Sequence, residues 1–346
     1  MRALVYYGPG KKSWEDVADP RIEDPEDAVV RVDAFTICGT DLHILRGDVP
    51  EVAPGTVLGH EAMGTVAEVG PGVRRVHVGD RVLISCITAC GRCRYCREGR
   101  YGQCLGGGGW ILGHTTNGVQ AESVRVPFAD GSVHRLPDEI PDETALMLAD
   151  VLPTSYEVGV VTGGVRPGDT VVVIGAGPIG LGAVMSARLV GALHVVVVDP
   201  VPSRRAAATA RGATHAAAPD DDVDGLVRGL SEGLGADVAI EAVGLPQTFD
   251  QAVALVRAGG RVANVGVHGR PTTLHLEDLW IRDVTITTGL VDTSSTPTLM
   301  RLLRAGRLDA AGLVTHRFAM DQVPRAYEVF DDPVASEAIK VAVARS

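Results

Sequence analysis

The sequence predicts an α/β protein with two domains, one rich in β-strands and one built on a doubly wound parallel sheet. Its 346 residues exceed what a single hydrophobic core usually organises. Residues 1 to about 150 contain short alternating runs bounded by Gly and Pro, which is typical of strands and loops. From Thr170 onward, continuous apolar runs alternate with helical stretches. Such runs indicate strands buried on both faces of a parallel sheet.

The individual elements follow from these patterns. In the first part, which is expected to be all-β with loops, the predicted strands are 28–34 and 64–70, and residues 79–84 are a turn that enters a strand. In the second part, a helix over 179–190 is expected among the strands 170–174, 194–199, 236–241 and 261–266. Helical segments from residue 293 and a last strand over 339–343 are expected to fold back onto the first domain. The predicted domains are therefore 1–153 with 293–346, and 154–292.

Composition and charge exclude several classes of protein. The formal net charge of −11 argues against binding to nucleic acid or to an anionic membrane. No segment approaches the ~18 consecutive apolar residues of a membrane helix, and the apolar start of the chain is too short for a signal sequence. We therefore expect a cytoplasmic protein. In a reducing cytoplasm, metal binding is the leading explanation for its six cysteines.

A glycine-rich turn carries the first functional motif. The segment Gly175-Ala176-Gly177-Pro178-Ile179-Gly180 fits G-x-G-x-x-G, and it follows a predicted buried strand and opens a predicted helix. In such a dinucleotide site the first glycine permits the tight turn, the second lets the backbone approach the pyrophosphate, and the third lets helix and strand pack closely. The alternative is a glycine turn that binds no nucleotide, which the order of strand, turn and helix disfavours.

An acidic residue supports the same site. Asp199 ends the next predicted strand, where a carboxylate would hold the adenosine ribose hydroxyls. Because a carboxylate there would repel a 2′-phosphate, the sequence favours NAD over NADP. Arg204 and Arg205 lie close by and weaken this preference.

Four closely spaced cysteines predict a structural zinc site. Cys90, Cys93, Cys96 and Cys104 can close a tetrahedron around zinc and leave no open position, in a lobe spanning residues 86–108. Four arginines among them can offset the negative charge of the thiolates: Arg92, Arg94, Arg97 and Arg100. The alternatives are free thiols or a nucleic-acid-binding zinc ribbon, and the spacing and the acidic chain argue against both. Cys86 lies outside the spacing and is expected to be a buried strand residue.

Candidates for a catalytic metal site are scattered along the chain. They are Cys38, His60, Glu61 and Asp150, and they lie on different segments. A catalytic zinc needs about three protein ligands and one open position. A lone Cys or His is more often structural than a ligand, so the residues alone do not assemble this site.

Two motifs carry a resemblance to a known family. The pattern Gly59-His60-Glu61-x2-Gly64-x5-Gly70-x2-Val73 resembles the signature of the zinc-containing medium-chain alcohol dehydrogenases, and residues 38–43 resemble the first ligand segment of that family. The cysteine lobe and the glycine-rich turn follow in the order of the family. The resemblance implies a GroES-like β-barrel catalytic domain, a Rossmann domain, an active site in the cleft between them, NAD and two zinc ions per subunit.

The resemblance also implies roles for individual residues. Cys38, His60 and Asp150 would be ligands of the catalytic zinc, with Glu61 beside the metal and able to enter its coordination. Asp at the position of Asp150 is similar to bacterial secondary alcohol dehydrogenases, whereas polyol and threonine dehydrogenases usually have Glu there. Thr40 would touch the substrate oxygen.

The implied reaction is hydride transfer between a small primary or secondary alcohol and NAD. The alcohol proton would leave through Thr40 and the nicotinamide ribose to His43. Trp110 matches a bulky wall of the substrate pocket, and such a wall favours small apolar alcohols. The alternative for Trp110 is an aromatic that shields a flexible loop from solvent.

Further cofactor contacts are implied by the family pattern. Lys340 resembles a basic residue near the cofactor phosphates, and residues 265–267 and 289–291 resemble loops that hold the nicotinamide. The complete set of expected cofactor contacts beyond the glycine-rich turn and Asp199 is Thr154, Arg204, Val243, Val265, Gly266, Val267, Leu290, Val291 and Lys340. For these loops, ordinary strand and loop packing is the alternative explanation.

The resemblance also bears on the oligomeric state and on alternative functions. The family implies a homo-oligomer, a dimer or a homotetramer, formed through the cofactor domain with 285–290 as an edge strand. A polyol or threonine dehydrogenase is the main alternative function. A zinc-less quinone-reductase relative lacks the Cys38, His60 and cysteine-lobe features. A non-catalytic, zinc-stabilised NAD-binding protein is disfavoured by the complete set of ligand, relay and cofactor residues.

Overall fold

The computed structural model describes residues 1–345, which form two compact units. Unit 1 comprises Met1–Asp150, Val291–Arg304 and residues 310–345. Unit 2 comprises Val151–Leu290 and Ala305–Asp309. The predicted boundaries lie within three residues of the two main ones. Residues 305–309, which the sequence analysis assigned to the first domain, group with unit 2 instead.

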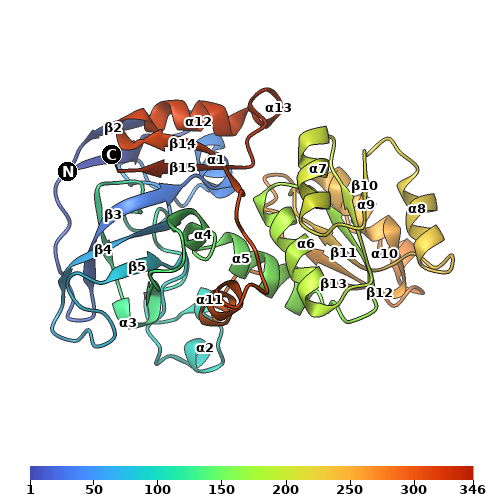
Figure 1. Cartoon of the computed structure of the whole chain (residues 1–346), viewed down its shortest axis with the longest axis horizontal. Helices are drawn as coiled ribbons and strands as arrows, with labels where there is room; N and C mark the ends of the chain where they lie inside the picture. The colour runs from blue at the N-terminus through green and yellow to red at the C-terminus, as the bar shows by residue number, and fades with distance from the viewer. Residues whose placement is uncertain (346) are drawn as a thin grey trace. The chain divides into compact units, whose positions relative to one another are not determined.

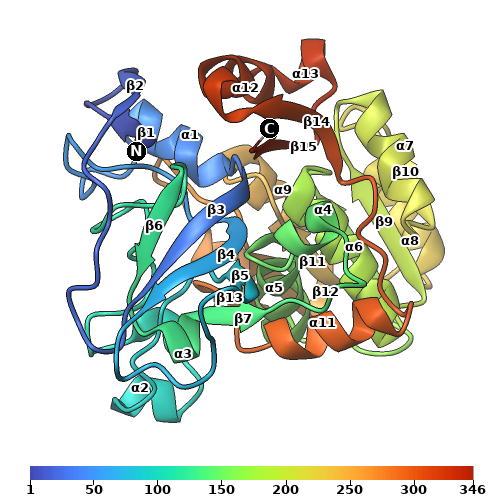
Figure 2. The same ribbon diagram turned by 60° about the vertical axis from the view of Figure 1, so that its left-hand side comes forward.

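Unit 1 is built on a seven-stranded sheet and a separate hairpin (Figures 1 and 2). The sheet has the order β14-β15-β3-β4-β5-β7, with β6 paired to β3, and only β14 and β15 run parallel. The hairpin pairs β1 with β2. The strands are β1 (Arg2–Tyr6), β2 (Lys12–Asp16), β3 (Ala28–Thr36), β4 (Ala62–Val69), β5 (Arg81–Ile84), β6 (Ser123–Val126), β7 (Val133–Arg135), β14 (Val314–Ala319) and β15 (Lys340–Ala344).

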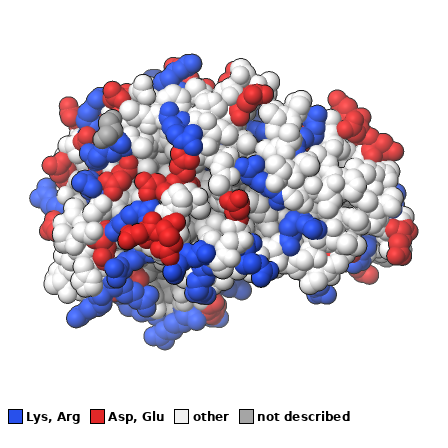
Figure 3. Space-filling view, in the orientation of Figure 1, with Lys and Arg blue, Asp and Glu red and all other residues white. Residues whose placement is uncertain are grey.

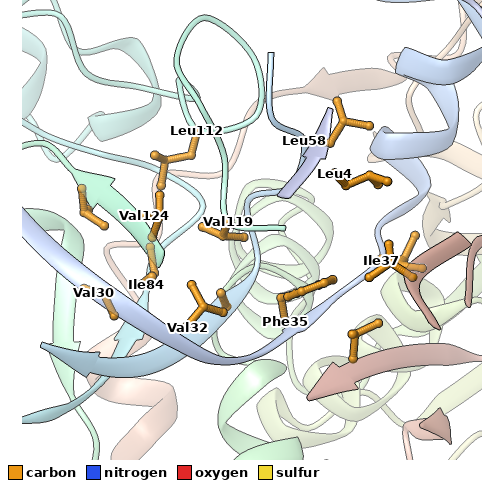
Figure 4. Close-up of a cluster of buried hydrophobic side chains, with 14 of the residues drawn as sticks. Leu4, Val30, Val32, Phe35, Ile37, Leu58, Ile84, Leu112, Val119 and Val124 are labelled. Atoms are coloured by element: carbon orange, nitrogen blue, oxygen red, sulfur yellow. The ribbon is translucent and has the colours of Figure 1, made fainter. Parts of the chain in front are cut away.

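The core of unit 1 gathers around β3, whose apolar residues are almost all buried. Figure 4 shows side chains from β3, β5 and β6 in one cluster with Leu112 and Val119, which come from an irregular loop. Burial of this apolar surface is the main favourable term in folding. The β-rich first domain expected from the sequence is confirmed, and β15 returns to pair with β3 as expected.

Unit 1 also contains helices. Those after residue 293 were expected, whereas the all-β prediction for residues 1–150 omitted the earlier ones. Figure 2 shows α12 beside β14 and β15. Helix α1 begins after Cys38 because Asp41 accepts a hydrogen bond from the Cys38 amide, and it ends at Gly47 in the left-handed conformation. The helices are α1 (Gly39–Arg46), α2 (Arg94–Arg97), α3 (Ala129–Ser132), α4 (Asp142–Leu146), α11 (Thr296–Arg304), α12 (Val323–Asp331) and α13 (Pro333–Ser336), with 3₁₀ turns η1 (Tyr101–Gln103) and η3 (Met320–Gln322).

Unit 2 is a six-stranded parallel sheet with the order β10-β9-β8-β11-β12-β13. The strands are β8 (Thr170–Ile174), β9 (His194–Val198), β10 (His215–Ala217), β11 (Ala236–Glu241), β12 (Val256–Asn264) and β13 (Thr285–Thr288). This order is that of a Rossmann sheet, whose strand order reverses beside its first strand, here β8. The doubly wound prediction is confirmed, and β12 begins five residues earlier than predicted because Val256 pairs with Ala236.

Helices α6 and α9 pack against the central strands β8 and β11 of this sheet. All five residues of β8 are buried, as the continuous apolar run predicted. The helical elements are α5 (Val151–Thr154), the π-helical segment η2 (Ser155–Thr162), α6 (Pro178–Val190), α7 (Pro202–Ala210), α8 (Val223–Leu230), α9 (Pro246–Leu255) and α10 (Leu276–Leu279). Among residues 1–345, no helix has the length and apolar character needed to cross a membrane.

Candidate functional site

The four cysteines of the lobe converge on one point in unit 1. Their sulfur atoms all lie within 4.8 Å of one another, and the Sγ atoms of Cys90 and Cys96 are 3.9 Å apart. A zinc ion with bonds of about 2.3 Å to four sulfurs separates those sulfurs by about 3.8 Å. The cluster therefore fits a tetrahedral, closed zinc site, which is structural rather than catalytic.

Backbone amides prepare two of these thiols to bind a metal. The amides of Cys96 and Leu105 donate to Cys93 Sγ at 3.5 and 3.4 Å, and they lower the pKa of Cys93 to about 6. Burial alone would raise the pKa of Cys104, but the amides of Cys90 and Gly106 hold it below its usual value. Since the thiolate is the metal-binding form, these donors favour the metal-bound lobe.

Arginines surround the lobe as the sequence suggested. Lys and Arg side chains gather over α2 at the lower edge of the view in Figure 3. Arg92 forms an ion pair with Glu26 at 2.8 Å, and Arg94 pairs with Glu98 at 3.0 Å. These two guanidinium groups therefore have carboxylate partners.

The scattered candidates for the second metal site meet in unit 1. Cys38, His60, Glu61 and Asp150 each place a ligand atom within 4.8 Å of the others, and all four are buried. Asp150 Oδ2 lies 3.7 Å from Cys38 Sγ and 3.7 Å from His60 Nε2. These separations suit three ligands on one zinc ion at bond lengths of about 2.0–2.3 Å. Zinc at this site would act as a Lewis acid.

The ionisation of these groups depends on one another. Burial raises the pKa of Cys38, and the nearby Glu61 raises it further. Burial alone would lower the pKa of His60, but Cys38 and Asp150 raise it well above its usual value. The set thus combines the soft sulfur donor of Cys38 with the imidazole of His60 and the hard oxygen donors of Glu61 and Asp150. A divalent cation would neutralise the negative charge of the thiolate and the carboxylates.

Asp41 lies behind His60, a candidate metal ligand, and the sequence analysis assigned it no role. Its Oδ1 lies 3.8 Å from His60 Nδ1, and neither atom has a hydrogen-bond partner. Its Oδ2 accepts from the Cys38 amide and from Gln120 Nε2, both at 2.9 Å. The Tyr327 hydroxyl donates to Gln120 Oε1 at 2.7 Å. A carboxylate behind a ligating histidine fixes the ring orientation and the tautomer.

Lys340 forms a buried ion pair beside the candidate metal ligands. The sequence analysis expects it near the cofactor phosphates, and in the structure its ammonium lies 2.5 Å from Glu61 Oε2 with the side chain 1% exposed. Thr36 also donates to that oxygen, and Glu61 Oε1 has no hydrogen-bond partner. Burial alone would lower the pKa of Lys340, but Glu61 raises it above its ordinary value. The charge of Lys340 is thus paired with that of the Glu61 carboxylate.

Thr40 and His43 lie one turn apart on α1. Thr40 Oγ1 is 3.7 Å from Cys38 Sγ, which puts the hydroxyl beside the metal ligands. His43 Nδ1 contacts Asp48 Oδ2 at 2.7 Å, and its side chain is 18% exposed. The positions suit a proton path that begins at the metal ligands and ends at a partly exposed imidazole.

Two further side chains border this metal site. The ring of Trp110 meets that of His60 edge-on, with centroids 6.1 Å apart, and stacks on His114 at 4.2 Å. Cys86 is buried as expected, but it lies beyond the end of β5, and its Sγ is 3.7 Å from Asp150 Oδ1. Burial raises the pKa of Cys86 well above the ordinary value, and Asp150 raises it further. Cys86 therefore borders the metal ligands, which its position outside the cysteine spacing did not reveal.

The glycine-rich turn of unit 2 has the geometry that a dinucleotide requires. Gly175 has φ +93°, which side chains rarely adopt. A Cβ on Gly180 would lie 1.8 Å from the Gly175 carbonyl oxygen, so only glycine lets α6 pack so closely. A Cβ on Gly177 would meet nothing within 4 Å. Gly177 caps α6 without a side-chain acceptor, and Pro178 follows as the first helical residue, which leaves the N-terminus open to a phosphate.

Asp199 stands immediately after β9, 3% exposed. Its Oδ2 accepts from the Ala176 amide at 2.7 Å, and its Oδ1 accepts from the Val201 amide at 2.8 Å. Arg205 donates to the carbonyl oxygens of Asp199 and Pro200. Arg204 is partly buried on α7, and burial lowers its pKa despite the opposing effect of Asp199. Asp199 thus ties the glycine-rich turn to the end of β9.

Three apolar side chains remain exposed beyond the carboxyl ends of neighbouring strands. Val243 follows β11 and is 40% exposed, Val267 follows β12 and is 44% exposed, and Leu290 follows β13 and is 43% exposed. Ligands of parallel sheets bind at this edge, near the point where the strand order reverses. The other residues expected near the cofactor are Thr154 at the end of α5, Val265 and Gly266 after β12, and Val291, which is buried in unit 1.

Comparisons with known proteins identify the family. Residues 24–138 match the model of the alcohol dehydrogenase GroES-like domain, and residues 178–305 match that of the zinc-binding dehydrogenases. A probable zinc-binding alcohol dehydrogenase of Mycobacterium tuberculosis is 37% identical over 94% of this chain and 84% of its own. A glutathione-independent formaldehyde dehydrogenase of Pseudomonas aeruginosa is 40% identical over 70% of this chain and 65% of its own.

A solved structure agrees over the whole length. The zinc-dependent alcohol dehydrogenase 2 from Streptococcus pneumonia has a TM-score of 0.96 and 44% identity, and the alignment covers 100% of this chain and 99% of that one. These matches agree with the two clusters of candidate zinc ligands and with the glycine-rich turn at the start of α6. The chain belongs to the zinc-containing medium-chain alcohol dehydrogenases and is a zinc-dependent, nicotinamide-linked alcohol oxidoreductase.

Proposed function

We propose that the protein oxidises small primary or secondary alcohols with NAD, at the metal site formed by Cys38, His60 and Asp150. The observation that carries this proposal is the convergence of these three ligands with Glu61 beside the Thr40 hydroxyl. Bound there, zinc supplies the Lewis acid that makes an alcohol proton easier to remove.

The residues of the chain provide the path for that proton. Thr40 Oγ1 relays the proton of the substrate hydroxyl, accepting that proton while it releases its own, because Thr40 Oγ1 lies 3.7 Å from Cys38 Sγ. His43 lies one turn further along α1, partly exposed, and passes the proton to solvent, with Asp48 holding its ring. We assign Asp41, whose Oδ1 lies 3.8 Å from His60 Nδ1, to the orientation of the His60 ring.

The choice of NAD over NADP rests on Asp199. A carboxylate at the end of β9 supports binding of a ribose with free hydroxyls and repels a 2′-phosphate. Both oxygens of Asp199 already accept one backbone amide each and keep further lone pairs for the ribose. We assign the nicotinamide to the edge of the sheet marked by Val243, Val267 and Leu290.

The substrate class rests on Trp110. Its ring and the His60 ring form an edge-on pair, and stacking on His114 holds the indole there, so a large ring limits the space beside the candidate metal ligands. This arrangement supports small apolar alcohols over polyols or threonine, which are the main alternative. The similarity to a formaldehyde dehydrogenase adds short aldehydes, as their hydrates, to the substrates to be tested.

We further propose a homo-oligomer, a dimer or a tetramer, formed through unit 2. Strand β13 lies at the edge of the parallel sheet and pairs only with β12 among the described residues. Near it in sequence, Trp280 is 75% exposed and Ile281 is 70% exposed. An exposed strand edge beside large apolar side chains supports pairing with a second copy. The cytoplasmic location remains a prediction from the sequence.

The test follows the absorbance of reduced nicotinamide with the zinc-loaded protein. Ethanol, 2-butanol, threonine, sorbitol and formaldehyde are each offered with NAD and with NADP. Cys38→Ala, which removes a metal ligand, serves as the blank. Turnover of 2-butanol or ethanol with NAD, absent from the blank, is the expected result. A preference for NADP would contradict the role given to Asp199, and a preference for sorbitol or threonine would contradict the role given to Trp110.

A further inference from the structure

Two loops of unit 2 interlock where β11 and β12 end. Glu241 and Asn264 are the last residues of these strands and face each other in the pairing register. A Cβ on Gly244 would lie 2.1 Å from the Val267 carbonyl oxygen, and a Cβ on Gly266 would lie 2.2 Å from the Gly244 amide nitrogen. The backbones of the two loops are therefore in direct contact, and any shift of one loop moves the other.

Glu241 organises both loops from inside. It is 0% exposed, and its Oε1 accepts from the amides of Val243 and Gly244 at 2.9 and 2.8 Å. Its main-chain oxygen accepts from the amides of Val265 and Gly266 at 2.8 and 3.0 Å. Its Oε2 is buried and accepts no hydrogen bond. A buried carboxylate oxygen without a donor is costly, so a compensating group nearby has a large effect.

His268 is that neighbouring group. Its Nε2 lies 3.6 Å from Glu241 Oε2 and 2.9 Å from Asn264 Oδ1, while its Nδ1 lies 3.2 Å from Thr272 Oγ1. Its ring also meets the ring of Phe249 on α9 edge-on, with centroids 6.2 Å apart. One side chain thus contacts the ends of both strands, the helix α9 and the far side of its own loop.

The donors and acceptors around His268 define how its ring is used. Asn264 Nδ2 donates to the Gly266 carbonyl oxygen at 3.1 Å, so Asn264 Oδ1 is the acceptor that faces His268. His268 Nε2 therefore faces two acceptors and carries the proton, which leaves Nδ1 to accept from the Thr272 hydroxyl. In this arrangement the N–H points toward Asn264 Oδ1 and the buried oxygen of Glu241.

We infer that His268 is a positioning residue that holds the nicotinamide loops, residues 242–248 and 264–268, in their cofactor-binding form through Glu241 and Asn264. The inference rests on the proposed function, since that proposal assigns Val243 and Val267 to the nicotinamide. In this role His268 acts through the loops rather than on the reacting atoms. Removing it frees both loops at once because they interlock at Gly244 and Gly266.

Hydrogen–deuterium exchange on the full chain without cofactor tests this directly. In His268→Leu, amide exchange in residues 242–248 and 264–268 should rise about tenfold, which corresponds to the loss of about one hydrogen bond. His268→Gln keeps an N–H donor on a side chain of similar reach and should restore most of the protection. His215→Leu, a histidine change on β10 at the opposite edge of the sheet, should leave these loops unchanged.

Cofactor binding gives the second readout. Fluorescence titration should show the Kd for NADH raised about tenfold in His268→Leu, with kcat at saturating NAD within about twofold of the parent and zinc content unchanged. If His268→Leu does not fold, Thr272→Val replaces it, with an expected rise of about threefold because only the Nδ1 contact is lost.

The outcomes separate the two proposals. If His268→Leu matched His215→Leu in amide exchange and in NADH affinity, the role of His268 would be overturned. Equal losses in His268→Leu and His268→Gln would also overturn it, because the donor at Nε2 would then be irrelevant. A parent protein that binds no NADH would refute the proposed function, while the exchange data would still decide whether His268 holds the loops.

Discussion

The ammonium of Lys340 lies 2.5 Å from Glu61 Oε2, and each side chain is 1% exposed. Two opposite charges are thus removed from water together, one on the first residue of β15 and one immediately before β4. Such a pair is stable only while both partners are present, because either charge alone would be buried without compensation. This relationship fixes the carboxylate that adjoins the metal ligands.

Lys340→Met should therefore lower the free energy of unfolding by about 3 kcal/mol, measured by urea denaturation. The double variant Lys340→Met with Glu61→Gln should recover most of that loss, because neither charge remains. Arg94→Ala, which breaks the exposed pair with Glu98, should cause a change close to the error of the measurement. Unchanged stability combined with weaker NADH binding would place Lys340 at the cofactor phosphates after all.

Asp41→Asn should weaken zinc binding at the Cys38 site between about tenfold and a hundredfold, because the amide carries no charge to orient His60. Competition with a fluorescent zinc chelator measures this affinity. Asp48→Asn is the matched control, since Asp48 contacts His43 rather than a metal ligand. Equal zinc affinity of Asp41→Asn and the parent protein would show that the 3.8 Å approach to His60 has no effect on binding.

Cys104→Ser should remove zinc from the cysteine lobe and leave the Cys38 site loaded. The lobe consists of turns, the short α2 and η1, so little apolar burial replaces the metal. Metal analysis should show about half the zinc of the parent protein, and the thermal midpoint should fall. The control variant Cys86→Ser changes a cysteine outside the lobe cluster and should leave the zinc of the lobe in place. Full zinc content in Cys104→Ser would refute the four-thiolate assignment.

His134 should make the fold sensitive to mild acid. Burial, together with the smaller effect of Arg75, lowers the pKa of this imidazole to about 4, and Nε2 has no hydrogen-bond partner. Between pH 6.5 and 4 the unfolded chain therefore binds a proton that the folded chain does not, so this contribution to stability is present above pH 6.5 and lost as the pH falls toward 4. The loss amounts to about 3 kcal/mol.

Urea unfolding as a function of pH measures this effect. His134→Phe, which fills a similar volume and does not titrate, should flatten the change in unfolding free energy between pH 6.5 and 4. His215→Phe should leave the profile unchanged. A parent protein and a His134→Phe variant with parallel profiles in this window would contradict the prediction.

The sequence alone predicted the features that depend on local pattern. The buried run 170–174, the turn at Gly175 and the helix after it follow one another along the chain, so their chemistry can be read without knowing the fold. The zinc site of the cysteine lobe could also be predicted from local spacing, because four thiols within fifteen residues can reach one ion in few backbone arrangements. Helix α1 was missed although Asp41 and Gly47 mark its ends, because its apolar pattern is short.

Only the tertiary structure decided how distant residues combine. Cys38 follows β3, His60 precedes β4 and Asp150 follows α4. Their convergence therefore depends on how these three elements pack. Lys340 and Glu61 form a pair because burial forces each charge to find a partner, which spacing in sequence does not reveal. Glu241 and His268 meet for the same reason, where two parallel strands end side by side. Local motifs thus determined which reactive side chains the chain carries, and packing decided which of these side chains meet in one site.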